Sequence, residues 1–241
     1  MADANRNTNN RKEPVTPRGG ATRTAILENA ARLFAEKGYE GTSLRDIGEA
    51  MNLTRQSVYH YFHSKEELLS TLVAETSEIA ADKLRSIRQD DTLDATEKLA
   101  RVTTALVVDR MEFSERFRML ERSESSLPEP VAGKHLAARR AVLSEVRAVL
   151  AEGIEAGQFR ECDDRLGALS LLGMCNWIAY WYHPGLSDSP DEVIGSFVET
   201  ARVMFANPEP GAPEPGTRGA LARVRRDLDR LDRIIHGPDL P

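Results

Sequence analysis

Apolar residues recur at helical spacing along most of the chain, and no run alternates apolar and polar positions for long enough to predict a strand. The first helix is expected at residues 24–37, where an apolar stripe is followed by Gly38, a residue typical of helix ends. The stripe consists of Ile26, Leu27, Ala30, Leu33 and Phe34. Further helices are expected at residues 43–51, 55–61, 64–87, 94–113, 115–124, 131–156, 163–182 and 190–206. The pattern therefore predicts an all-α fold.

Two of these helices are short and are separated by a sharp turn at Asn52. Asparagine tolerates the left-handed backbone conformation that such a turn requires. Thr54 is placed to cap the second short helix, and Ser64 with Glu67 has the pattern of a capping box for the next one. Two short helices joined by a tight turn and packed on a longer first helix make a helix-turn-helix. The alternative is a short aromatic helix that only packs the core.

The second short helix begins with side chains that suit the edges of DNA bases. In a helix-turn-helix the second helix enters the major groove with its N-terminal residues at the bases. Arg55 and Gln56 stand at this end, and arginine pairs with guanine as glutamine does with adenine. Thr54 and Ser57 add short hydroxyl groups for phosphate or base. We therefore expect these four residues to contact DNA.

The rest of this helix separates into a core side and a polar side. Val58 and Phe62 are expected in the core. Tyr59, His60 and Lys65 flank the place where sugar and phosphate would run. We expect them to anchor the DNA backbone.

The charge distribution agrees with a DNA-facing N-terminal end. The formal net charge of the whole chain is −6. Residues 1–63 hold 9 Lys and Arg against 7 Asp and Glu, whereas the remaining 178 residues hold 23 against 31. The first part is thus mildly basic, and the acidic remainder is expected to face away from phosphate.

The segment at about residues 22–75 resembles the N-terminal domain of TetR-type transcriptional regulators. The resemblance rests on Ala31, Leu33, Phe34, Gly38, Tyr39, Thr42, Ile47, Val58, Tyr59, Phe62, Lys65 and Glu66. It implies a three-helix helix-turn-helix DNA-binding domain, with phosphate contacts at Thr42, Ser43 and Arg45. It also implies base reading at Arg55, Gln56 and Ser57, and backbone anchoring at Tyr59, His60 and Lys65. The chain departs from the family at Gly48 and Asn52, where alanine and glycine are common; Gly48 is expected to loosen its helix slightly.

The helix expected at residues 163–182 is apolar on both faces. One face carries Leu166, Leu169, Gly173, Trp177 and Tyr180. The opposite face carries Ala168, Leu171, Cys175, Ile178 and Tyr182. A helix that is apolar all round must be covered all round, so we expect core on one side and a partner subunit on the other. The next helix, with the start signal Ser189-Pro190-Asp191-Glu192, adds apolar residues that suit a homodimer of two helices from each subunit.

The stretch NWIAYWYHPG concentrates four aromatic residues, and ordinary core and interface packing accounts for most of them. A second interpretation places Trp177, with Met174 and Asn176, at the wall of a ligand cavity, because a buried amide needs hydrogen-bond partners. The segment resembles the C-terminal domain of TetR-type repressors of lipid and steroid catabolism, which implies an acyl-CoA effector. His183 stands where those repressors usually have arginine, and Gly173 lacks their long basic side chain, which weakens the expected anion clamp. Exposed arginines on helices are usually only solvated, but five could still meet a phosphate-bearing ligand: Arg116, Arg118, Arg122, Arg139 and Arg140.

The expected domain plan has five parts. A flexible basic arm at residues 1–21 either follows the minor groove or only adds attraction for DNA. The helix-turn-helix domain follows at 22–63, and the helical-bundle ligand-binding and dimerisation domain at 64–206. A proline- and glycine-rich linker at 207–219 leads to an amphipathic helix at 220–236.

Other classes of function lack their signatures. Cys162 and Cys175 are the only cysteines, too few for a disulfide framework or an ordinary zinc site, so no metal ligands are expected. No secretory signal, membrane-length apolar run, nucleophile elbow or phosphate loop is present, so we expect a cytoplasmic protein that is not an enzyme and has no cofactor. The main hypothesis is a dimeric repressor released from operator DNA by a small molecule. The alternative is a DNA-binding regulator with no small-molecule switch, controlled by a protein partner.

Overall fold

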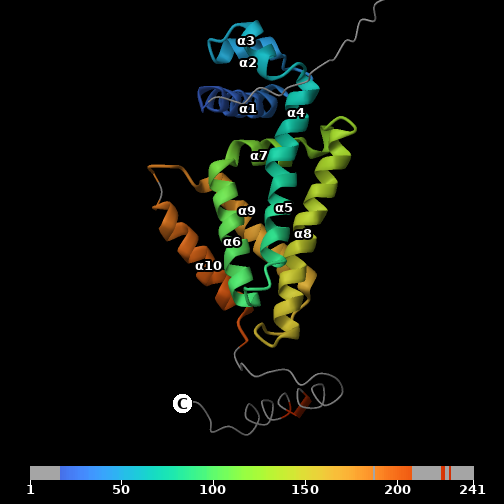
Figure 1. Ribbon diagram of the computed structural model, residues 1–241, viewed down its shortest axis with the longest axis vertical. Helices are drawn as coiled ribbons and strands as arrows, with labels where there is room; N and C mark the ends of the chain where they lie inside the picture. Colours follow the sequence, from blue (N-terminus) through green and yellow to red (C-terminus); the bar gives the residue numbers. More distant parts are fainter. Residues whose placement is uncertain (1–16, 187, 208–223, 226–227, 229–241) are drawn as a thin grey trace, which may run out of the picture. The chain divides into compact units, whose positions relative to one another are not determined.

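The computed structural model describes residues 17–186, 188–207, 224–225 and 228. All helices in this part of the chain are α-helices apart from two short turns, a π-helical one at Ala74–Glu78 and a 3-10 one at Glu124–Ser126 (Figure 1). The α-helices are α1 (Pro17–Lys37), α2 (Leu44–Ala50), α3 (Arg55–Tyr61), α4 (Lys65–Val73), α5 (Ile79–Arg88), α6 (Ala95–Glu112), α7 (Ser114–Ser123), α8 (Val131–Glu155), α9 (Asp164–Trp181) and α10 (Pro190–Phe205). The predicted all-α class is confirmed.

The first helix is longer than its apolar stripe predicted. It begins at Pro17 rather than at Thr24, so residues 17–21 are helical and the prediction of a flexible arm does not hold for them. Proline is accepted in the first turn of a helix, because the N–H that it lacks has no partner inside the helix. Residues 1–16 of the predicted arm lie outside the described residues. So do the linker beyond Asn207 and the predicted helix at 220–236, except for Val224, Arg225 and Leu228.

The chain forms two compact units. Unit 1 comprises residues up to Thr76 together with Glu115–Lys134, and unit 2 comprises Ser77–Ser114 and the chain from His135 onward. Unit 1 therefore contains α7 as well as α1 to α4. Its core includes Phe34, Val58, Phe62, Leu72 and Leu120, all nearly inaccessible to solvent, and Val58 and Phe62 lie in the core as predicted.

The turn between α2 and α3 depends on Asn52, whose role was predicted, and on Gly48, whose role was not. Asn52 has a φ of 54°, which confirms the predicted left-handed turn. Gly48 does more than loosen α2. A Cβ at this position would lie 3.1 Å from the carbonyl oxygen of Leu53 and 3.2 Å from Cγ2 of Val58. The absence of a side chain thus lets the turn close against α2.

The predicted helix at 64–87 is interrupted by the π-helical turn at Ala74–Glu78. At its start, Ser64 caps α4 as expected, with its hydroxyl accepting a hydrogen bond from the Glu67 N–H at 3.1 Å. The Glu67 carboxylate, however, accepts from the N–H of His63 at 2.7 Å. The predicted capping box, in which Glu67 would bind the N–H of Ser64, is therefore only half correct.

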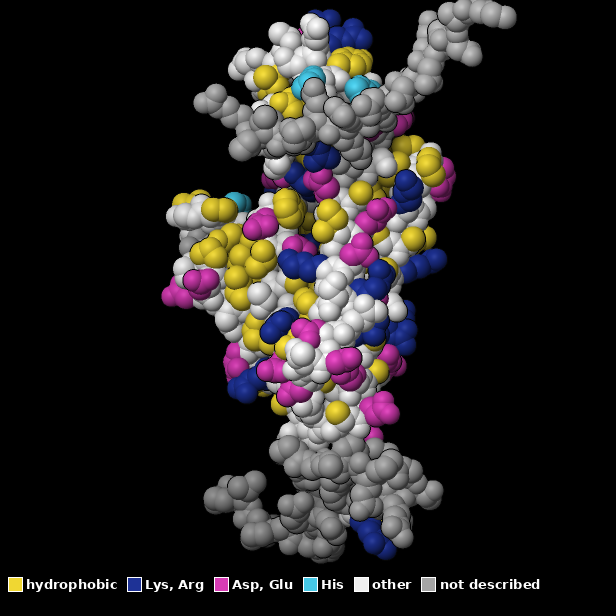
Figure 2. All heavy atoms as spheres, in the orientation of Figure 1, with side chains coloured by type: hydrophobic (Ala, Val, Ile, Leu, Met, Phe, Trp, Pro, Cys, Tyr) yellow, Lys and Arg dark blue, Asp and Glu magenta, His cyan; other side chains and the backbone are white. Residues whose placement is uncertain are grey.

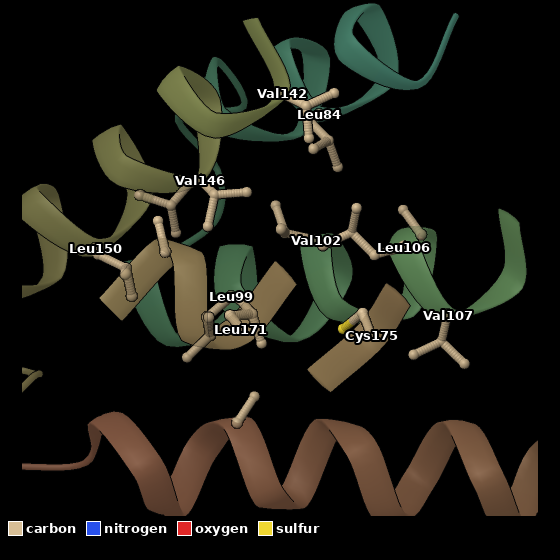
Figure 3. Packing of buried hydrophobic residues seen from close by; sticks show 14 of the residues in the cluster. Leu84, Leu99, Val102, Leu106, Val107, Val142, Val146, Leu150, Leu171 and Cys175 are labelled. Carbon is tan, nitrogen blue, oxygen red and sulfur yellow. The ribbon is translucent and has the colours of Figure 1, made fainter. Parts of the chain in front are cut away.

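Unit 2 is built around α6, which packs against α5, α9 and α10. Figure 3 shows side chains of α5, α6, α8 and α9 directed toward one another, among them Leu84, Val102, Val146 and Leu171. These four residues are inaccessible or nearly so, and apolar burial of this kind is the main source of stability. No helix among the described residues is long and apolar enough to cross a membrane.

The end of α10 is joined to the loop that follows α8. The Arg160 N–H donates to the carbonyl of Phe205 at 2.9 Å, and the Asn207 N–H donates to the carbonyl of Gln158 at 3.2 Å. The Asn207 side-chain amide also donates to the carbonyl of Gly157 at 2.9 Å. These hydrogen bonds fix the last turn of α10 to the body of unit 2.

Candidate nucleic-acid interface

A groove of about 550 Å³ lies in unit 1 between the start of α2, α3 and the start of α4. It gathers six of the ten residues predicted to bind DNA: Thr42, Ser43, Arg45, Arg55, Tyr59 and Lys65. The other four, Thr54, Gln56, Ser57 and His60, do not line it. The predicted residues therefore divide into a groove set and an outer set, a division that spacing along the sequence did not reveal.

Arg55 belongs to the groove set because of its contact with Tyr59. The Arg55 guanidinium lies 5.1 Å from the centroid of the Tyr59 ring and donates a hydrogen bond from Nη2 to the Tyr59 hydroxyl at 3.2 Å. The two residues are one helical turn apart and so share a face of α3. Arg55 had been expected to read bases with Gln56, but adjacent helical positions point about 100° apart. The structure separates the two side chains.

Lys65 is held in the groove by Tyr39. Its ammonium donates to the carbonyl oxygen of Tyr39 at 2.8 Å and lies 4.1 Å from the centroid of the Tyr39 ring. The Tyr39 hydroxyl donates to Glu66 at 3.2 Å. Burial and the nearby Glu66 carboxylate raise the pKa of Tyr39 to about 12, so this hydroxyl stays protonated. Tyr39 was not predicted as a site residue, because its contact with Lys65 joins positions 26 residues apart and follows only from the fold.

Thr42 does not present its side chain to the groove. It is 2% exposed, and its hydroxyl lies 2.9 Å from the carbonyl of Gly38 and 3.3 Å from that of Leu33. The hydroxyl therefore fixes the chain after α1, and the expected contact between this side chain and phosphate does not fit its burial. A threonine can satisfy the carbonyl groups at a helix end, and here this need determines its orientation.

Ser43 and Arg45 are oriented by carboxylates of α2. Ser43 caps the helix, and its N–H donates to the Asp46 carboxylate at 2.8 Å. Hydrogen bonds from Ser43 lower the pKa of Asp46. Arg45 is exposed and donates to Glu49 at 2.7 Å, a contact that solvent screens and that a phosphate can replace.

The outer set lies outside the groove, on a neighbouring side of α3. Thr54 caps the helix by accepting from the Ser57 N–H, and the hydroxyls of Thr54 and Ser57 lie 2.8 Å apart. Gln56 and His60 are exposed and one helical turn apart. This side of α3 therefore presents an amide, an imidazole and hydroxyls, which are groups that hydrogen-bond to base edges.

The residues predicted to contact a ligand do not face the same way in unit 2. Asn176 accepts a hydrogen bond from Nε of Arg110 at 2.9 Å, and Arg110 is buried. Met174 is half-buried against the core of unit 2. Trp177 is 63% exposed and stacks on Tyr180 with the ring centroids 5.4 Å apart. The amide and the indole therefore lie in different surroundings.

Trp177 is part of an exposed apolar surface on α9 and α10. Leu166, Leu169 and Tyr180 share its face of α9 and are also exposed, as is Val203 on α10. Figure 2 shows hydrophobic side chains gathered around α10. The opposite face of α9 is fully covered at Ala168, Leu171, Cys175 and Ile178. Both predicted faces of α9 are thus present, one in the core and one exposed.

Comparisons with known proteins match both the N-terminal and the C-terminal part of the chain to one family. Residues 26–72 match the family model for bacterial regulatory proteins of the tetR family, and residues 92–205 match that for the tetracyclin repressor-like C-terminal domain. The HTH-type transcriptional repressor KstR2 of Rhodococcus jostii (strain RHA1) is 31% identical over 201 residues, which cover 77% of this chain and 92% of the relative.

Two solved structures are similar over most of the chain. The TetR family transcriptional regulator PfmR from Thermus thermophilus is 31% identical with a TM-score of 0.62, covering 74% of this chain and 97% of its own. AibR, solved in complex with isovaleryl coenzyme A and operator DNA, is 25% identical with a TM-score of 0.60 and covers 74% and 96%. The likeness thus includes both the DNA-binding and the C-terminal parts.

Proposed function

The chain belongs to the tetR family of bacterial regulatory proteins, and we propose from this that it is a dimeric repressor released from operator DNA by an acyl-CoA thioester. The observation that carries the proposal is the division of the α2–α3 surface into a groove set and an outer set. One set has the cations that phosphate requires, and the other has the groups that base edges require. The family consists of transcriptional regulators, and DNA is the partner of this surface.

The groove set holds the DNA backbone in this proposal. Arg55, Arg45 and Lys65 supply the cations, and the Tyr59 hydroxyl is placed beside Arg55 as a further hydrogen-bond donor. Base reading falls to Gln56, with Ser57 and His60 on the same outer side of α3. Arg55 was predicted to read bases, but we now assign it to phosphate, because its guanidinium is held toward Tyr59. The two roles differ in their dependence on salt and sequence.

A second copy of the chain covers the exposed apolar face of α9 and α10. Trp177, Tyr180 and Leu169 are large side chains that would otherwise remain in water. Aromatic residues at the centre of an interface contribute most of its binding free energy. A twofold dimer places two copies of α3 against two half-sites, which explains how a seven-residue helix achieves specificity.

The effector acts on unit 2 and carries negative charge. Arg110 is a buried cation whose Nε is held by Asn176, and its charge also lowers the pKa of the neighbouring Cys175 against the effect of burial. A buried guanidinium suits a phosphate-bearing ligand such as coenzyme A. AibR binds isovaleryl coenzyme A with a similar fold, which supports this class. Of the three predicted contacts, Asn176 lies beside Arg110, Met174 packs against the core of unit 2, and Trp177 lies with the proposed dimer face.

Release requires only that the effector bind one conformation more tightly than the operator-binding one. The proposed action is cytoplasmic, with DNA and a thioester as partners and no membrane. The test is binding of the purified chain to DNA upstream of its own reading frame at fixed salt, with and without a panel of acyl-CoA thioesters. Release by one thioester, but not by its free acid, is the expected result. Tight binding that no thioester changes would instead favour control by a protein partner.

A further inference from the structure

Arg116 is the most deeply buried charged side chain among the described residues, at 2% exposure. It lies on α7, and its guanidinium forms ion pairs with two carboxylates from other elements of unit 1. Nε is 2.7 Å from Glu28 on α1, and Nη1 is 2.9 Å from Glu75 in the π-helical turn. Arg23 of α1 also pairs with Glu75. The four residues, here called the Arg116 cluster, join three elements that are far apart in sequence.

The cluster lies beside two places where the chain passes between the units. Glu75 comes one residue before Thr76, where the first segment of unit 1 ends. Arg116 directly follows Glu115, where the second segment of unit 1 begins. A single guanidinium therefore links both passages to α1. Because α1 packs directly on α2 and α4, its position determines that of the DNA-binding helices.

Ion pairs formed by a buried guanidinium tolerate little change in geometry. A guanidinium removed from water is stable only while its carboxylate partners remain in place, so the cluster is expected to be either fully formed or broken. Burial raises the pKa of Glu28, and the Arg116 guanidinium partly offsets this effect. A π-helical turn is also an irregularity that occurs at functional positions in helices. Together these features suit an element with two states, one formed and one broken.

We propose that the Arg116 cluster is a conformational latch that couples unit 2 to the DNA-binding helices of unit 1. The latch is formed in the operator-binding state, and it opens when unit 2 takes the released conformation. The inference rests on the proposed function, since it assigns the route by which that regulation acts. Coupling between two sites is reciprocal, so operator binding to unit 1 must change unit 2 through the same latch.

This reciprocity allows a test that needs no identified effector. Hydrogen exchange of the full-length chain is measured with and without a saturating duplex from the region upstream of its own reading frame. The readout is α6, because α9 and α10 would respond to dimerisation alone. In the wild type, the duplex is expected to slow α6 exchange at least threefold. In Arg116→Met, which binds the duplex at saturation, the change in α6 is expected to disappear, whereas protection of α3 remains.

Two further variants separate coupling from general damage. Glu28→Gln removes one carboxylate charge with little change of shape, and it is expected to reduce the α6 response by at least half. Arg88→Met removes an arginine that pairs with Glu145 within unit 2, and it should behave as the wild type. A wild-type α6 response in Arg116→Met and Glu28→Gln, or no α6 response in the duplex-bound wild type, overturns the latch. A wild type that binds no duplex overturns the proposed function instead.

Discussion

The exposed faces of α3 and α9 differ in the kind of partner that each requires. On α3 the exposed residues are polar and ordered by position, so Gln56 and His60 stand apart from Arg55 and Tyr59. On α9 the exposed face carries large apolar side chains, among them Leu166 and Trp177, which are in contact with water. A polar face can stay in water and bind its partner reversibly. An exposed apolar face suits a lasting cover, which the proposed dimer would supply, since exposure of apolar side chains to water costs free energy.

The largest effect is expected from a charge on the apolar face. If α9 and α10 form the proposed dimer interface, Trp177→Asp should give a monomer and weaken operator binding by more than 100-fold, because each copy loses an aromatic anchor worth roughly 2 kcal/mol or more. Sedimentation and operator titration measure the two effects. The matched control is Ile79→Asp on α5, since Ile79 is 58% exposed but lies outside α9 and α10. A Trp177→Asp protein that remains dimeric contradicts the interpretation of this face.

On α3 the outer set should determine sequence preference. Gln56→Ala is expected to cost roughly 1–3 kcal/mol at one base position and to relax the preference there, because a glutamine contact to a base edge is lost. Binding to a library of operators substituted at each position measures this. Equal weakening on every operator would assign Gln56 to the phosphate contacts instead.

The groove set should respond to salt and not to sequence. Arg55→Ala and Lys65→Ala are each expected to weaken all operators alike and to lower the slope of log affinity against log salt by about one. Tyr59→Phe removes the hydroxyl that Arg55 contacts, and a smaller, sequence-independent loss is expected. A change of base preference in Arg55→Ala would show that Arg55 reads bases after all.

A smaller effect is expected from closing the space at Gly48. Gly48→Ala gains helix propensity, but its Cβ meets the Leu53 carbonyl and Val58, which must shift by a few tenths of an ångström. The balance is expected to lower the free energy of unfolding by about 1 kcal/mol, as chemical denaturation can measure. A more stable Gly48→Ala protein would show that the turn has room to adjust.

The smallest effect concerns the covered face of α9. Burial raises the pKa of Cys175 to about 12, so its thiol should resist alkylation at pH 8 in the native protein. Since this thiol ionises more easily in the unfolded chain, stability is fully present below the unfolded pKa of about 8.5 and falls above it, by roughly 0.5–1 kcal/mol at pH 9. Cys175→Ala should remove that dependence. Rapid native alkylation of Cys175 would mean that this face opens readily.

Local signals in the sequence predicted local structure well. Asn52, Thr54 and the Ser189 start signal act on their own neighbours within a few residues, and each is found as expected. The two faces of α9 also followed from spacing alone. Orientation within a motif did not, because the side on which Arg55 lies depends on Tyr59 and the surrounding groove. The motif therefore predicted which residues lie at the surface of α3, but not how they divide.

Contacts between segments that are far apart in the sequence could not be predicted from the spacing of residues. Arg116 was expected as an exposed residue or a ligand for phosphate, but it is buried because Glu28 and Glu75 meet it from other helices. Gly48 likewise depends on a turn that folds back onto it. Such positions are determined by packing, and a sequence pattern records only the spacing along one element.

The hydrogen bonds at the end of α10 have a mechanical consequence. Asn207 and Phe205 are fastened to Gln158, Gly157 and Arg160, so tension applied to the chain beyond Asn207 reaches the loop after α8 before it reaches the helix. These hydrogen bonds must break before α10 can unfold from its last turn. A surface tether or fusion partner attached at the C-terminal side should therefore pull on unit 2 as a whole and leave the face of α9 and α10 undisturbed.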